Sequence, residues 1–215
     1  FNSYDNHDYI GDPELETERS LESNLSFSYK KPAYEFTVAA SYFRVYNYII
    51  GKVDPSLRTM TIGADGVKLY TNLEDARLFN TSLSGSYAIS EAFDLSGSIS
   101  YHRGVDDKGD HLPLISPFSY TTALEFNRGQ ISASLSAEGA GEQTNYNPAY
   151  GETKTASYAI LSASLGKRFF INANDLFLKT GVDNLFDTYY STYTDWNNIP
   201  RMGRNFYLTI TYSIN

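Results

Sequence analysis

The sequence predicts an all-β fold, an antiparallel up-and-down transmembrane β-barrel wall, and three observations lead to this prediction. Segment after segment alternates apolar and polar residues, as a strand does when its two faces meet different environments. The connections between these segments are long and short in strict alternation. Each segment is close to the roughly 10 residues that a tilted membrane-spanning strand needs.

The last segment shows the alternation most clearly. Its apolar residues share one face and its polar residues share the other: Phe206, Leu208, Ile210, Tyr212 and Ile214 against Asn205, Tyr207, Thr209, Thr211 and Ser213. Earlier segments repeat this pattern, so the expected strands cover residues 23–30, 34–42, 79–89, 93–101, 118–126, 131–138, 159–165, 176–182 and 205–214.

The order of the connections decides between β architectures. The expected short turns are residues 31–33, 90–91, 127–129 and 170–174, and the expected long loops are 51–65, 103–117, 140–155 and 185–204. Residues 1–20, interrupted by Gly11 and Pro13, are expected to form a further long loop. Consecutive antiparallel strands then place every long loop at one end, as in outer-membrane barrels. A Greek-key sandwich would not sort its loops in this way.

Composition excludes several classes of protein. The net charge of -8 disfavours a nucleic-acid partner, and the absence of Cys excludes disulfides and thiolate metal sites. No run approaches the roughly 20 apolar residues of a membrane-spanning helix. The start at Phe1 lacks the basic and apolar regions of a signal peptide, so we expect a mature chain or a fragment. A soluble β-rich binding module remains an alternative, because period-2 alternation alone fits any two-layer β protein.

The end of the chain resembles the end of TonB-dependent receptors, the outer-membrane active transporters of Gram-negative bacteria. The resemblance lies in the sequence VDNLFD at 182–187, followed by Tyr189 or Tyr190 and by IPRMGRNF at 199–206. A second similarity is IGDPELETE at 10–18, which resembles a GNP-x-L-x-PE segment of the family, with Asp12 in place of Asn and Thr17 in place of Pro. Residues 70–76 resemble a third, weaker family segment. The chain departs from the family at its end, because Ile214-Asn215 replaces the expected terminal aromatic.

The resemblance implies that residues 1–215 are the C-terminal portion of a receptor barrel. The family's barrel has about 22 strands around a plug, so these would be the last nine. The plug, the TonB box and the earlier strands would belong to a part of the receptor not present in this sequence. The implied partners are that remaining part, the TonB-ExbB-ExbD system acting through it, outer-membrane lipid and a small-molecule or metal-complex ligand. The implied location is the bacterial outer membrane.

Candidate ligand-binding residues lie in or near the long loops. Histidine is a common metal ligand, whereas Tyr, Trp and Arg suit an amphipathic anionic ligand through stacking and charge-assisted hydrogen bonds. The candidates are His7, Tyr46, Tyr48, His102, His111, Tyr146, Tyr190, Tyr193, Trp196 and Arg201. The alternative for each is a solvated or structural loop role. Glu138, Lys179 and Asp183 fall on inward-facing positions, where they could pair with a plug or line the route past it.

No catalytic constellation stands out, so we expect no enzyme and no cofactor. The function implied by the resemblance is TonB-dependent uptake of a scarce nutrient, such as a ferric siderophore or another metal complex. A passive porin-like channel and a surface-binding outer-membrane barrel remain the alternatives, and the sequence does not choose a substrate.

Overall fold

The computed structural model describes residues 2, 5–116, 118–150, 152–172, 174–193, 195 and 198–214, without the side chain of residue 149. This part of the chain is almost entirely strand. Its elements are β1 (His7–Ile10), β2 (Arg19–Lys30), β3 (Tyr34–Val53), β4 (Gly66–Ala88), β5 (Phe93–Asp106), β6 (Ser119–Arg128), β7 (Ile131–Ala140), the 3-10 turn η1 (Pro148–Tyr150), β8 (Tyr158–Ile171), β9 (Asn174–Asp183) and β10 (Asn205–Ser213). No helix among these residues has the length and apolar character needed to cross a membrane.

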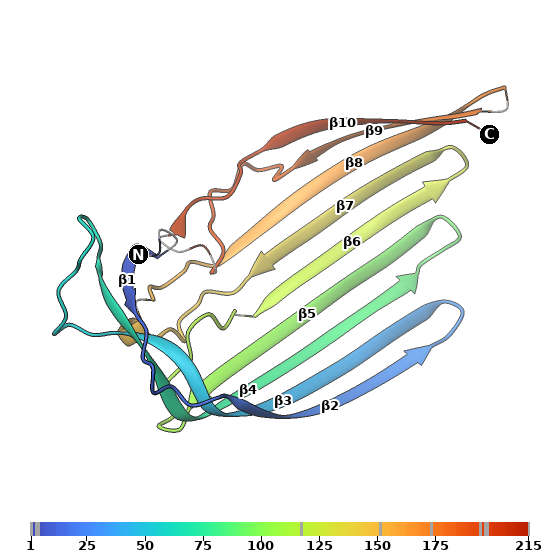
Figure 1. The fold of residues 1–215 in the computed structure, drawn as a ribbon. Coiled ribbons are helices and arrows are strands. Elements are labelled where there is room, and N and C mark those ends of the chain that lie inside the picture. Colours follow the sequence, from blue (N-terminus) through green and yellow to red (C-terminus); the bar gives the residue numbers. More distant parts are fainter. Residues whose placement is uncertain are drawn as a thin grey trace.

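The strands form one curved sheet that does not close on itself (Figure 1). From β2 to β10 each strand pairs antiparallel with the next strand in the chain, so the spatial order is the sequence order. Within the described residues, β2 and β10 are therefore the two edges. This confirms the predicted up-and-down antiparallel wall.

The sheet is a single layer, and its apolar side chains face outward from it rather than into a core. On β10, Phe206, Leu208 and Ile210 keep 73%, 65% and 63% of their surface exposed. The opposite face of the sheet carries serine and threonine, which pair across strands, as Ser98 does with Thr121. We call these the apolar face and the polar face. A sheet of this kind has one face suited to hydrocarbon and one suited to water.

The long and short connections are sorted as predicted. Residues 31–33, 89–92, 129–130 and 172–173 form the short connections, and residues 54–65, 107–118, 141–157 and 184–204 form the long ones. Figure 1 shows all the short turns at one end of the sheet, next to the C-terminus, and the long loops at the other. The boundaries differ most in β3 and β4, which extend far beyond the predicted strands as a long hairpin. Asn47, whose φ of 56° is the left-handed conformation that Asn tolerates, interrupts the alternation in β3.

The prediction of a loop over residues 1–20 is wrong in part. Residues 7–10 form β1, which pairs in parallel with the first residues of β4, and β2 already begins at Arg19. A buried ion pair holds β1 in place: Asp5 accepts a hydrogen bond at 2.8 Å from Lys68 Nζ, and both side chains are almost fully buried. Tyr9 also donates to this carboxylate. Asp8 accepts hydrogen bonds from the backbone amides of Met60 and Thr61, which fixes the tip of the β3–β4 hairpin to β1.

Aromatic rings lie across glycines of the neighbouring strand at several positions. Tyr120 is paired with Gly139, and Tyr207 is paired with Gly181. A Cβ added at Gly139 would lie 2.4 Å from the Tyr158 carbonyl oxygen and 2.6 Å from the Tyr120 hydroxyl. A side chain at position 139 would therefore clash with the backbone of β8 and with the Tyr120 ring. At Gly141 an added Cβ would meet nothing closer than 3.7 Å.

We predict that Gly139→Ala destabilises the folded barrel by about 1–3 kcal/mol, because the backbone of β8 or the ring of Tyr120 must shift. The measurement is the temperature at which the folded form converts to the unfolded form on a gel. Gly141→Ala is the matched control and should leave that temperature unchanged. Equal stability of the two variants would contradict the proposed packing.

We predict that Asp5→Asn detaches β1, because it removes the carboxylate charge that lies beside the buried Lys68 ammonium, at a cost of about 3 kcal/mol. Burial would raise the pKa of Asp5, but the hydrogen bonds from Lys68 and Tyr9 outweigh it and hold the pKa below its usual range. The stabilisation by Asp5 is therefore complete above its unfolded pKa and falls as the pH drops through the lower folded value.

The measurement for this prediction is hydrogen exchange of residues 7–10 and 60–61. We expect faster exchange in Asp5→Asn than in the native chain. Asp12, which is partly exposed and whose carboxylate accepts a hydrogen bond from the Glu14 amide, provides the control Asp12→Asn. Unchanged protection of β1 in Asp5→Asn would show that the ion pair does not hold this strand.

Candidate functional site

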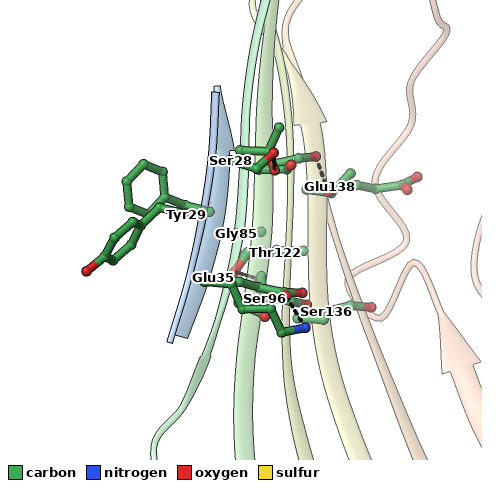
Figure 2. A pocket seen from close by; sticks show the side chains of 18 of the residues that line it. Ser28, Tyr29, Glu35, Gly85, Ser96, Thr122, Ser136 and Glu138 are labelled. Carbon is green, nitrogen blue, oxygen red and sulfur yellow. Dashed lines mark hydrogen bonds and ion pairs between the residues drawn. The ribbon is translucent and has the colours of Figure 1, made fainter. Parts of the chain in front are cut away.

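The polar face is hollowed into a cavity of about 680 Å³ in the half of the sheet near the short turns. Figure 2 shows its lining, in which Ser28, Ser96 and Ser136 come from three different strands. Hydroxyl pairs across the strands satisfy much of this wall, as between Ser28 and Thr37 at 2.9 Å.

Charged groups are sparse on this wall. Lys30 and Glu35 form an ion pair at 2.8 Å at the short-turn end. Glu138 lies in the cavity lining, and Figure 2 shows it beside the hydroxyl wall. Within the described part of the chain, Glu138, Lys179 and Asp183 take part in no ion pair. They stand on the polar face as predicted, because their partners in the register are polar-face residues.

Two of the three histidines come together where the polar face meets the long loops. His102 Nδ1 hydrogen-bonds Asn80 Oδ1 at 2.8 Å, and Asn80 Nδ2 donates to Ser41. His102 and His111 both border a pocket of about 140 Å³, together with Glu142. This pocket can accept a small polar group. Among the described residues no three His, Cys, Asp or Glu side chains are grouped closely enough to hold a metal ion.

Glu152 joins three of the long loops. Its carboxylate accepts hydrogen bonds from the Leu114 amide at 2.7 Å, from the Asn147 amide at 3.1 Å and from the Tyr193 hydroxyl. Burial and the neighbouring Glu152 carboxylate raise the pKa of the Tyr193 hydroxyl, so this group stays a neutral donor. Tyr193 was a candidate from the sequence, whereas Glu152 was not. Nothing in its polar loop sequence distinguished Glu152 from a solvated glutamate.

Arg201 is committed to a contact within its own loop. Its Nε and a terminal nitrogen donate to the two carboxylate oxygens of Asp195 at 2.7 and 2.6 Å. Burial would raise the pKa of Asp195, but donors from Thr192 and Arg201 outweigh it and hold the pKa below its usual range. The Arg201 amide also donates to the Tyr190 carbonyl, and the Tyr190 ring lies 4.7 Å from that of Tyr158. These contacts order the mouth of the polar face from the β9–β10 side.

The VDNLFD segment that carries the resemblance stabilises the β9–β10 loop by hydrogen bonds. Asn184, with φ of 51°, exchanges side-chain hydrogen bonds with the backbone of Thr188. Asp187 accepts the Arg204 amide at 2.7 Å, and Arg204 Nε donates to the Leu185 carbonyl at 2.9 Å. The segment therefore fixes the position at which β10 begins.

The remaining candidates are dispersed. His7 is buried in β1, where its Nδ1 lies 2.6 Å from the Asp5 carbonyl oxygen. Tyr46 is on the apolar face under the Arg44 guanidinium, 4.8 Å from its ring centroid, and Tyr48 follows the Asn47 irregularity. Tyr146 is half-buried in the β7–β8 loop. Trp196 lies outside the described residues.

The comparison with protein families identifies this architecture. The model of the family described as TonB dependent receptor-like, beta-barrel matches residues 1–185. A search of curated proteins gives no match. Members of this family are transporters and receptors characteristic of the Gram-negative outer membrane.

Solved structures show the same fold. The copper transporter OprC matches with a TM-score of 0.81 and 20% identity over 94% of this chain. The siderophore receptor PirA from Acinetobacter baumannii matches with a TM-score of 0.71 and 15% identity over 96% of this chain. The ferric-catecholate import receptor Fiu from E. coli K12 matches with a TM-score of 0.66 and 19% identity over 93% of this chain. The chain spans only 32%, 33% and 28% of these three chains. With its nine antiparallel strands, its sorted loops and the family match over most of its length, this chain belongs to the TonB-dependent receptor β-barrel family.

Proposed function

We propose that this chain is the C-terminal wall of an outer-membrane receptor that imports a scarce nutrient in a TonB-dependent manner. The observation that carries the proposal is the single-layer sheet, apolar on one face and hydroxyl-lined on the other, with its long loops at one end. The apolar face would contact lipid, the polar face the lumen, and the long loops the exterior.

The open edges support the view that more of the receptor completes the wall. Unpaired backbone groups in hydrocarbon cost several kcal/mol each, so β2 and β10 require neighbouring strands. A barrel of about 22 strands encloses a lumen wide enough for a plug. The plug would rest against the hydroxyl-lined cavity, and Glu138, Lys179 and Asp183, which form no ion pair with another described residue, offer it charged contacts.

A metal complex, such as a ferric siderophore, is the substrate class we propose. Solved relatives include receptors for ferric enterobactin and a copper transporter. The mouth of the polar face offers histidine, carboxylate and amide groups around the pocket of His102 and His111. We further propose that the chain has no enzymatic role, and that the alternative, a passive channel, would lack both the plug and the need for energy.

The test is uptake by a strain that expresses the receptor containing this chain. We predict that metal accumulation, measured by elemental mass spectrometry in metal-limited medium, depends on the receptor and disappears in a strain lacking TonB. Abundance of the receptor in the outer-membrane fraction of both strains is the control. Accumulation that persists without TonB would favour the passive channel, and absence of the receptor from that fraction would overturn the membrane placement itself.

A further inference from the structure

An arginine cluster lies on the apolar face where that face meets the long loops. Arg44 and Arg77 are direct register partners on β3 and β4. Arg103 of β5 pairs with Phe79, two positions along the same face of β4 from Arg77. Arg19, at the start of β2, pairs with Tyr46, two positions along the same face of β3 from Arg44. Because side chains two apart on a strand share a face, these four arginines, the Arg19 cluster, form one patch across β2 to β5.

The charge of the cluster is only partly compensated. Asp75, the register partner of Tyr46, is the acidic residue within these rows of the apolar face. It lies 3.1 Å from Arg44 Nε and 3.7 Å from Arg77 Nε. Among the described residues, Arg19 and Arg103 take part in no ion pair. The patch therefore holds four guanidinium groups and one carboxylate.

Two features show that the cluster is costly for the isolated chain. Like charges placed directly opposite on neighbouring strands destabilise a sheet, and Arg44 faces Arg77 in this way. The Nε atom of Arg77 is buried and donates no hydrogen bond. A buried donor without an acceptor costs free energy, so the patch is stabilised by any further anion that supplies acceptor oxygens.

The position of the patch next to exposed apolar side chains indicates that this anion is a lipid headgroup. From the arginine patch toward the short turns, the same face carries the exposed residues Tyr42 and Phe79, followed by Leu25 and Tyr101. These are the residues that would contact hydrocarbon. Guanidinium groups bind phosphate through paired, charge-assisted hydrogen bonds. A lipid of the surrounding leaflet presents phosphate at this depth, with its acyl chains over the apolar rows.

We propose that the Arg19 cluster binds the phosphate groups of anionic lipids at the long-loop rim of the barrel. This inference rests on the proposed placement of the apolar face in the membrane. Bound phosphate neutralises the Arg44–Arg77 pair and orders the base of the β3–β4 hairpin, whose upper part carries β1. A lipid contact at this rim thus supports the loop region in which the receptor would take its substrate.

The opposite rim supplies a matched control. Lys167 of β8 lies on the apolar face near the short turns, and Lys31 lies in the turn between β2 and β3, far from it in the sheet. Each ammonium lies over an aromatic ring two residues away in the chain, Tyr29 at 5.7 Å and Phe169 at 5.0 Å. They carry the same charge as two arginines of the cluster without forming a patch.

The experiment is native mass spectrometry of the complete receptor released from an uncharged detergent, titrated with phosphatidylglycerol and, separately, with phosphatidylcholine. We expect preferential retention of phosphatidylglycerol. The double variant Arg44→Gln, Arg103→Gln should bind it about 25-fold more weakly, at about fivefold for each charge removed. The control Lys31→Gln, Lys167→Gln should retain the native affinity.

Equal affinity of the native and arginine-variant receptors for phosphatidylglycerol, or an equal loss in the lysine control, would overturn the proposed cluster. A prior flotation step separates this outcome from failure of the proposed function. A receptor that does not float with phosphatidylcholine vesicles is not a membrane barrel. A receptor that floats but shows no arginine-dependent preference is a membrane barrel without this lipid site.

Discussion

Backbone hydrogen bonding between neighbouring strands is the constraint on which this structure depends. The sheet has one layer, so its strands gain little from a packed interior, and hydrocarbon offers no alternative partner for an amide or a carbonyl. Each strand from β3 to β9 pairs on both sides with its neighbours in the chain over most or part of its length. Side-chain alternation then has a single task, which is to present lipid-compatible groups on one face and hydroxyls on the other. The close contacts of Tyr120 with Gly139 and of Tyr207 with Gly181 serve the same ladder, since they fill the gaps where a glycine exposes backbone.

The buried side chains of this protein are concentrated at the long-loop end of the sheet. Five of the buried apolar residues, Ile50, Val67, Ala76, Leu112 and Tyr150, belong to the long hairpin, the upper strands or the loops. Polar anchors are buried with them, including the Asp5–Lys68 ion pair and the Glu152 carboxylate that joins three loops. The wall thus takes its stability mainly from the strand ladder, whereas the long-loop end has a small core of buried apolar and polar side chains. The Arg19 cluster lies at the boundary between the single-layer wall and the long-loop end.

Much of the wall could be predicted from the sequence because alternation is a local signal. The patterns at 205–214 and 131–138 place both faces correctly, and the loop lengths alone predict that the long loops share one end of the sheet. The upper parts of β3 and β4 could not be predicted, because Asn47 breaks the period and mixed residues follow it. β1 was missed since four residues carry too little pattern, and its anchor, Lys68, lies far away in the sequence. The structure brings only some of the candidate residues together: His102 and His111 share a pocket, but Tyr46 lies on the apolar face and Arg201 is held by Asp195. Which loop residues meet depends on contacts between loops, and no local pattern encodes these.

The most direct test of the account asks which medium each face of a strand contacts. The chain has no Cys, so this part of the receptor adds no background when single cysteines are labelled with an environment-sensitive fluorophore. The measurement is quenching of Leu208→Cys and Thr209→Cys in receptor-containing liposomes, by a lipid-bound quencher and by aqueous iodide. The account predicts that the lipid quencher acts on the label at position 208 and iodide on the label at position 209, because these neighbours point to opposite faces of β10. Equal access of iodide to both labels would contradict a membrane-embedded wall with an aqueous lumen.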